Sequence, residues 1–173
     1  GIVWRKVPEK VARQKKLIPG DIIIEKSGGS PTQPVGRVVF FENAEGPFLC
    51  NNFTAVIRSR NNGQIFSRYL FYALFFKHKY GQTLRFQNKT TGIINLQLAK
   101  YIAFEHVPLP PIETQRKIAI ILDKAQELID LRKAQMEKMD EFLRSVFLDM
   151  FGDPVTNPKG WEVSPLGDIG DWK

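Results

Sequence analysis

The chain has 173 residues, 43% of them hydrophobic, and its formal net charge at pH 7 is +7. This is enough material for one folded core, with or without an extended element. No stretch of about 18 apolar residues argues for a membrane-spanning helix, and the single cysteine, Cys50, excludes an internal disulfide and predicts a cytoplasmic location.

The positive charge is concentrated in the first part of the chain. Residues 1–110 contain 16 Lys or Arg and 6 Asp or Glu, a net charge of +10. Residues 111–152 carry a net charge of −1, and residues 153–173 carry −2. A basic segment beside a nearly neutral one predicts a polyanionic partner for the first and a protein partner for the second.

Short strands separated by turns are predicted over the first 60 residues. Pro19 and Gly20 form a turn ahead of the first strand, and residues 27–31 and 43–47 are expected to be loops. The predicted strands cover residues 22–25, 36–41, 48–53 and 55–58.

The next segment changes period and predicts a helix. Apolar residues from Phe66 onward lie three and four apart, with Ser67 near the start and Gly81 at the end. A polar loop is expected at 89–92, followed by a short helix capped by Asn95. Residues 104–109 should be extended because of the prolines around them. Residues 1–110 are therefore predicted to form an α+β domain of short strands with helices.

Residues 111–152 predict one long helix, because no proline or glycine interrupts them between their two ends. Steps of four and three give a 3.5-residue period, which is typical of a helix packed lengthwise on another, as in an antiparallel coiled coil. At ~1.5 Å per residue, this helix would be about 58 Å long. The apolar positions are Ile118, Leu122, Ala125, Ile129, Met136, Met139, Leu143, Val146 and Met150.

Arg132 occupies one position of this series where an apolar residue is expected. It either sets the register of a helix pair, or lays its apolar stem along the groove. Beyond the helix, Gly152 is the expected C′ residue, and residues 153–173 are rich in turns. The apolar residues of this tail are too few to form a core, so we expect them to pack on another element or to begin a further domain.

Signatures of catalysis are missing from the sequence. It contains no GxxxxGK[ST] phosphate loop, and Gly28 and Gly29 do not belong to a GxGxxG motif. The two histidines, His78 and His106, have no cysteine or second histidine at zinc-binding spacing. The sequence therefore predicts a non-enzymatic protein with no metal site and no cofactor of its own.

Polar and basic residues gather around the predicted helix at 66–80. Lys and Arg neutralise phosphates, while Arg, Asn and Gln pair with base edges, so this group is a candidate DNA-binding site. The alternative is an ordinary solvated surface. The candidates are Arg58, Arg60, Asn61, Asn62, Arg68, Lys77, Lys79, Tyr80, Arg85, Asn88 and Lys89.

The segment 107–119, VPLPPIETQRKIA, followed by Ile121, Leu122 and Asp123, resembles the start of the helical spacer in the specificity subunits of type I restriction–modification enzymes. Further similarity lies in LIPGDI at 17–22, VGRV at 35–38 and FGDP at 151–154. These segments are spread over most of the chain, and the spacer motif is the most specific of them.

The resemblance implies a role in reading double-stranded DNA. Such subunits usually contain two target-recognition domains, each of which reads half of a split DNA sequence, separated by antiparallel spacer helices. The spacers set the distance between half-sites and bind methyltransferase (M) subunits, which hold S-adenosylmethionine. Restriction (R) subunits join the complex, and the specificity subunit itself is not catalytic.

The order of the segments departs from this pattern. Residues 1–110 resemble only the later part of a recognition domain, residues 111–152 one spacer, and residues 153–173 the start of a next recognition domain. We therefore expect two copies to pair antiparallel through their long helices as a homodimer. A truncated assembly or inhibitory module that binds methyltransferase subunits without reading DNA stays open, whereas a stand-alone enzyme has no motif in its favour.

Overall fold

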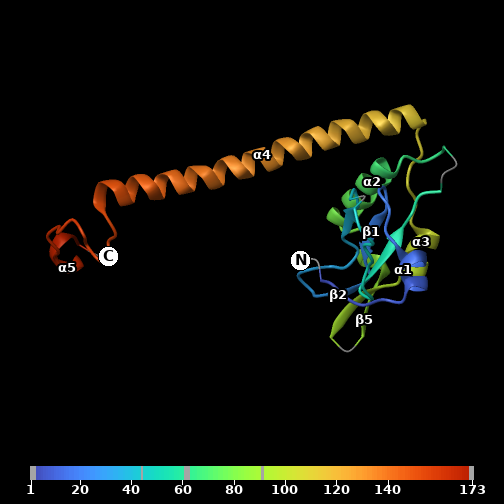
Figure 1. The fold of residues 1–173 in the computed structure, drawn as a ribbon, viewed down its shortest axis with the longest axis horizontal. Helices are drawn as coiled ribbons and strands as arrows, with labels where there is room; N and C mark the ends of the chain where they lie inside the picture. The colour runs from blue at the N-terminus through green and yellow to red at the C-terminus, as the bar shows by residue number, and fades with distance from the viewer. Residues whose placement is uncertain (1–2, 44, 61–62, 91, 172–173) are drawn as a thin grey trace. The chain divides into compact units, whose positions relative to one another are not determined.

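The computed structural model describes residues 3–43, 45–60, 63–90 and 92–171, without the side chains of Lys89 and Thr90. The chain forms two compact units, Gly1–Asp123 and Lys124–Lys173, which are described separately. Helices and short antiparallel strands are mixed in the first unit, and the predicted α+β class is confirmed (Figure 1).

The described residues of the first unit form two three-stranded antiparallel sheets, with strand orders β3-β1-β4 and β2-β6-β5. In the first sheet, Ile23 of β1 lies opposite Val39 of β3 and Val56 of β4. The strands are β1 (Ile22–Glu25), β2 (Ser27–Gly29), β3 (Val38–Phe40), β4 (Thr54–Ile57), β5 (Gln87–Thr90) and β6 (Ile93–Leu96). The helices of this unit are α1 (Glu9–Lys15), α2 (Ser67–Lys79), the 3-10 helix η1 (Leu84–Phe86), α3 (Leu98–Phe104) and the first turns of α4 (Ile112–Phe151).

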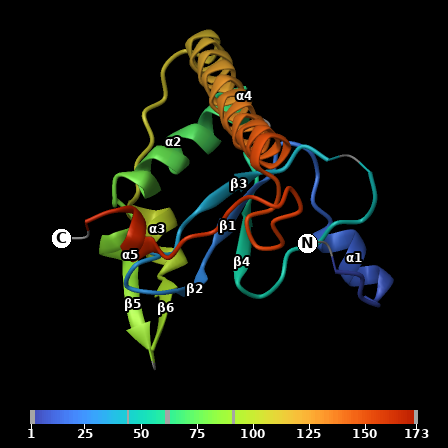
Figure 2. The same ribbon diagram turned by 90° about the vertical axis from the view of Figure 1, so that its left-hand side faces the viewer.

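One hydrophobic core joins both sheets to α2 and α3. Ile22 and Ile24 are completely buried and alternate with half-buried neighbours along β1, as expected for a strand with one face in the core. Helix α2 packs beside β3, where the rings of Phe40 and Phe71 are 5.6 Å apart (Figure 2). The other buried members of the core are Val35, Val38, Leu74, Phe86, Ile94, Leu96 and Tyr101.

Parts of the two predicted loops at 27–31 and 89–92 belong to strands in the structure. Residues 27–29 form β2, whose Ser27 hydroxyl donates a hydrogen bond to the side chain of Asn95 on β6. Residues 89 and 90 end β5. Asn95 therefore does not cap a helix, and α3 begins later, after Gln97. Polar composition predicted loops here, but pairing with β6 supplies the backbone hydrogen bonds, from a distant segment for β2 and within a hairpin for β5.

Other predicted bounds also differ from the structure. Residues 48–53 do not form a strand, and the carbonyl of Phe53 instead accepts hydrogen bonds from the amides of Lys26 and Ser27. Phe104, predicted to be extended, is the last residue of α3. The basic segment that follows Pro8, for which no helix was predicted, forms the seven-residue helix α1.

Gly36, part of the VGRV segment, is needed for two reasons. Its φ of +101° is a left-handed conformation that residues with a Cβ atom adopt only with strain. A Cβ at this position would also lie 2.9 Å from Cγ2 of Thr83. Thr83 is completely buried at the end of the turn that follows α2. Gly36 thus allows the chain before β3 to approach this turn closely.

In the second unit, the tail folds back on the end of α4. Gly152 is the C′ residue, with φ of +79° and its amide bonded to the carbonyl of Leu148 at 2.9 Å. Lys159 Nζ donates to the carbonyls of Asp149 and Met150, and Trp161 Nε1 donates to the carbonyl of Phe151 at 2.8 Å. The short helix α5 (Leu166–Ile169) follows.

The side chains of residues 162–171 are solvent-exposed in this unit. Val163 is 81% exposed, and Leu166 and Ile169 are each 66% exposed. Within the part of the chain that the structure describes, no helix combines the length and apolar character needed to cross a membrane.

The burial of β1 leads to a stability prediction. Replacing the completely buried Ile24 with Ala should reduce the free energy of unfolding by roughly 2–5 kcal/mol, because it removes core contacts and leaves a cavity. Val39→Ala, on the neighbouring strand and 60% exposed, is the control and should cost less than about 1 kcal/mol. Urea denaturation followed by circular dichroism measures both, and equal losses would contradict the core assignment.

Candidate nucleic-acid interface and assembly helix

The residues predicted to bind DNA are distributed over several sites. Arg58, just after β4, forms an ion pair with Asp21: its Nε and Nη2 atoms lie 2.6 and 2.7 Å from the carboxylate oxygens. Nη2 also donates to the carbonyl of Lys16 at 3.1 Å. The Asp21 side chain is completely buried, whereas that of Arg58 is half exposed. Arg58 therefore links the end of β4 to the turn before β1, and part of its side chain stays accessible to solvent.

The carboxylate of Asp21 is held in its charged form. Burial by itself would raise its pKa, but hydrogen bonds from Arg58 and from the Ile18 amide outweigh burial and lower the pKa. This explains the physical role of the aspartate in the LIPGDI segment, which resembles the specificity-subunit pattern. Asp21 stabilises the turn before β1 and is not itself available for surface contacts.

Arg68, on the first turn of α2, lies between two carboxylates. Its Nε donates to Asp123 Oδ1 at 2.6 Å, and its Nη1 donates to Glu42 Oε1 at 3.0 Å. The guanidinium carbon lies 4.6 Å from the ring centre of Phe40, in a cation–π contact. The Arg68 side chain is only 21% exposed, so its guanidinium group interacts mainly with neighbours inside the domain.

Lys77 and Arg85 share one partner, Glu105, which follows α3. Lys77 Nζ lies 2.6 Å and Arg85 Nη2 lies 2.8 Å from the two carboxylate oxygens. The Glu105 side chain is 5% exposed; burial favours a raised pKa, but the hydrogen bonds from both cations outweigh it and lower the pKa. Arg85 also covers the ring of Phe86 and keeps 57% of its side chain exposed.

The other candidates are more accessible. Arg60, Lys79 and Asn88 are exposed, and within the described residues neither Arg60 nor Lys79 forms an ion pair. Tyr80 is 74% exposed and stacks on Phe76. Asn61 and Asn62 lie outside the described residues, as does the side chain of Lys89.

A second group of exposed cations surrounds α1 and was not among the predicted site residues. Arg13 pairs with Glu9, whereas the other five cations between residues 3 and 16 have no ion pair in the described part of the chain. The bond from Arg58 to the Lys16 carbonyl places this segment beside the end of β4. The five are Arg5, Lys6, Lys10, Lys15 and Lys16.

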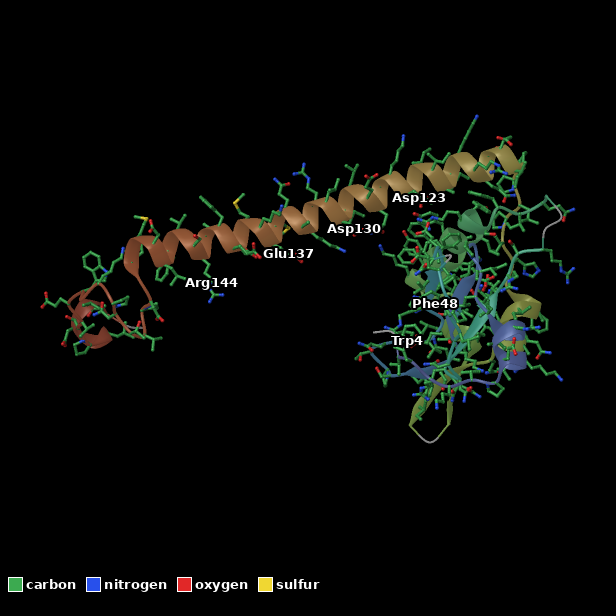
Figure 3. The ribbon with its side chains drawn as sticks, viewed as in Figure 1. Trp4, Phe48, Asp123, Asp130, Glu137 and Arg144 are labelled. Carbon is green, nitrogen blue, oxygen red and sulfur yellow. The ribbon has the colours of Figure 1, made fainter. Side chains whose placement is uncertain are left out.

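The signal for this group was present in the sequence, since the opening WRKVPEKVARQKK is basic throughout. Trp4 adds an aromatic ring that is 90% exposed (Figure 3). The prediction favoured the residues around α2, where basic and amide side chains alternate. Several of those cations instead pair with carboxylates that are distant in sequence.

The long helix presents two different surfaces along its length. In its first turns Gln115 and Ala119 are completely buried, and the predicted seam residues Ile118 and Leu122 are half-buried. From residue 125 onward every predicted seam position is exposed. These positions are Ala125, Ile129, Arg132, Met136, Met139, Leu143, Val146 and Met150.

The exposed seam is widened by neighbouring apolar residues. Leu128 is 64% and Phe142 is 61% exposed, one step beside the seam on the same face. Arg132 donates from Nη1 to Gln135 Oε1 at 2.9 Å, so its charged group is bound along its own helix. Asp130, Glu137 and Arg144 project from α4 at intervals of seven residues on a separate, charged face (Figure 3). An apolar face of this extent is typical of an interaction surface.

Comparison with known proteins gives consistent matches. A family model described as "Type I restriction modification DNA specificity domain" matches residues 7–140. A putative type I restriction enzyme MjaX specificity subunit from Methanocaldococcus jannaschii is 27% identical over 168 residues, which covers 95% of this chain and 38% of the relative.

A second relative, the type I restriction enzyme MjaVIII specificity subunit from the same organism, is 33% identical over 106 residues. That match covers 61% of this chain and 24% of the relative. The chain thus spans less than half the length of the curated relatives that it matches.

The shared carboxylate of Glu105 leads to a pH-dependent prediction. Glu105→Gln should lower the free energy of unfolding at neutral pH by roughly 1–2 kcal/mol, a modest loss because water screens the exposed Arg85. Since the folded-state pKa of Glu105 lies below its ordinary value of 4.5, its stabilising effect is present above that pH. It is lost as the pH falls through the folded-state pKa.

Urea titrations at neutral pH and below pH 4.5 measure this effect. The difference in free energy of unfolding between the unsubstituted chain and Glu105→Gln should become smaller in acid. Glu42→Gln is the control, because the Glu42 side chain is 70% exposed and should contribute less than about 1 kcal/mol. A difference for Glu105→Gln that does not change with pH would contradict the assignment.

Proposed function

This chain belongs to the type I restriction–modification DNA specificity family, and we propose on this basis that its first 110 residues bind double-stranded DNA in a sequence-specific manner. The observation that carries the proposal is the charge distribution. The net charge of +10 lies in residues 1–110, and exposed cations without an ion pair among the described residues remain there after the internal ion pairs are formed. Such cations bind phosphates and release counterions.

We assign the contacts according to how accessible each side chain is. The proposed direct contacts to DNA are the exposed members of the predicted group, Arg60, Lys79, Tyr80 and Asn88. The exposed parts of the Arg58 and Arg85 side chains are added to them. Arg68 and Lys77 act chiefly by holding the scaffold in place, while Asn61, Asn62 and Lys89 remain proposed contacts by their chemistry alone. The cations around α1 are proposed phosphate contacts.

The exposed apolar face of α4 is the proposed assembly surface. It would pair with a second spacer helix in antiparallel orientation, supplied by another copy of this chain in a homodimer, and would bind methyltransferase subunits. Those subunits would hold S-adenosylmethionine, and restriction subunits would join through the complex. In this proposal the chain is cytoplasmic, sets the distance between half-sites, and contributes no catalytic residue.

A second candidate function is favoured by one observation. Because Arg58, Arg68, Lys77 and Arg85 are engaged in ion pairs, the domain could serve only in assembly or inhibition, binding methyltransferase subunits without reading DNA. Mobility-shift assays on random-sequence duplexes separate the two functions. A bound duplex supports DNA recognition, and a chain that binds methyltransferase subunits but no duplex supports assembly alone.

The proposed phosphate contacts predict a steep salt dependence. The logarithm of the association constant should fall linearly with the logarithm of salt concentration, by ~0.9 for each neutralised phosphate. Changing Lys10, Lys15 and Lys16 to Gln should reduce this slope by about 0.9 for each contact that is lost. Changing Lys124, Lys133 and Lys138 on α4 to Gln is the charge-matched control and should leave the slope unchanged.

The proposed homodimer predicts a concentration-dependent mass. Sedimentation velocity should detect dimers of the unsubstituted chain, and Met136→Glu with Leu143→Glu should shift it to monomers by placing charges on the apolar face. Lys138→Glu, which lies off this face, is the control and should still dimerise. A monomer at tens of micromolar for the unsubstituted chain would argue strongly against pairing.

A further inference from the structure

Gln115, in the first turn of α4, is a completely buried amide. Its Nε2 donates to the carbonyl of Gln64 at 2.9 Å and to that of Pro110 at 2.8 Å. Its Oε1 accepts a hydrogen bond from the amide of Phe66 at 2.9 Å. One side chain thus joins the residues just before α2 to those just before α4.

A second anchor lies eight residues further along the helix. Asp123 Oδ1 accepts hydrogen bonds from Arg68 Nε and from the Tyr72 hydroxyl, each at 2.6 Å. Burial, and then the hydrogen bond to Asp123, raise the pKa of Tyr72 to about 12, so this hydroxyl is a permanent donor at neutral pH. Ala119, midway between the anchors, is completely buried against the domain.

The two anchors have a geometric consequence. At ~1.5 Å per residue they are about 12 Å apart along the helix axis, so they oppose both tilt and rotation of α4. Both anchors contact the start of α2, Gln115 through the amide of the N-cap residue Phe66 and Asp123 through the side chains of Arg68 and Tyr72.

The chemistry of these anchors favours a role in orientation over simple adhesion. Apolar side chains would hold a helix on a domain equally well, and a buried amide is costly unless every polar atom is bonded. A fully satisfied polar network, however, accepts only one arrangement and makes it rigid. Gln115 supplies such a network at the first end of the contact. At the other end Asp123, whose side chain is 38% exposed, holds Arg68 and Tyr72 through one carboxylate oxygen.

We propose that Gln115 and Asp123 are positioning residues that make the first turns of α4 a rigid extension of the recognition domain, and thereby fix the spacing of the half-sites that the protein accepts. This inference rests on the proposed function. One added base pair moves a half-site by about 3.4 Å and rotates it by roughly 35°. A junction that swivels would tolerate such a change, and a rigid junction rejects it.

Rigidity can be measured on the chain without DNA. Spin labels at Lys79→Cys on α2 and Glu137→Cys on α4, with Cys50 replaced by Ser, report one distance by electron double resonance. Dilution with unlabelled chain removes distances between copies. We expect one narrow distribution for the chain with both anchors, and a broad distribution when Gln115→Met removes three hydrogen bonds at nearly constant volume.

Two further variants make this measurement decisive. Gln126→Met is the matched control, because this exposed amide lies on the same helix and, among the described residues, its side chain bonds only to Asp130. Its distance distribution should stay narrow. Asp123→Asn tests the second anchor, and it decides the outcome if circular dichroism shows that Gln115→Met is unfolded. A broad distribution with both anchors present, or a narrow one after both substitutions, would overturn the proposal.

Spacing is the functional readout. In a complex reconstituted with methyltransferase subunits, the methylated adenines are first mapped to locate the two half-sites. Duplexes then carry these half-sites at native spacing or with one added base pair. Gln115→Met should reduce the ratio of methylation at native to lengthened spacing, and an unchanged ratio would overturn the role in spacing. If the unsubstituted complex methylates neither duplex, the proposed function fails, whereas the distance measurement still judges the junction by itself.

Discussion

Three carboxylates organise the basic domain. Asp21, Glu105 and Asp123 each bind one or two cations, and the side chains of the first two are 0% and 5% exposed. A segment with a net charge of +10 could not pack closely if its cations approached one another unpaired. These few carboxylates therefore divide the cations into those that hold the fold together and those that remain available to an external anion.

This division explains which parts of the site could be predicted from the sequence. Local signals sufficed for β1, an apolar run that follows a Pro-Gly turn, and for α4, whose heptad period is clear over the whole helix. They did not suffice for Arg58 and Arg68, whose partners lie 37 and 55 residues away in sequence. Whether a cation is free depends on a tertiary contact, and residue type and loop position do not encode it. The exposed cations around α1 show the converse case: the sequence does not reveal that they lack an ion pair among the described residues, and they were not predicted as site residues.

The helix α4 shows why a heptad period identifies a surface but not its partner. Ile118 and Leu122 belong to the same apolar series as Met136 and Leu143, yet the first two lie against their own domain and the latter are exposed. The polar residue Gln115, absent from that series, makes the most specific contact of the first turns. The buried amide was not predicted, because a lone glutamine on a helix is ordinarily solvated.

The exposed apolar face of α4 also bears on the life of the chain in a cell. Met136 is 69% and Leu143 is 60% exposed, and side chains of this kind are what chaperones and quality-control proteases bind. A newly made copy that finds no partner would be removed faster than one that does. The amount of this protein in a cell would then follow the supply of its partners more closely than the rate at which it is synthesised.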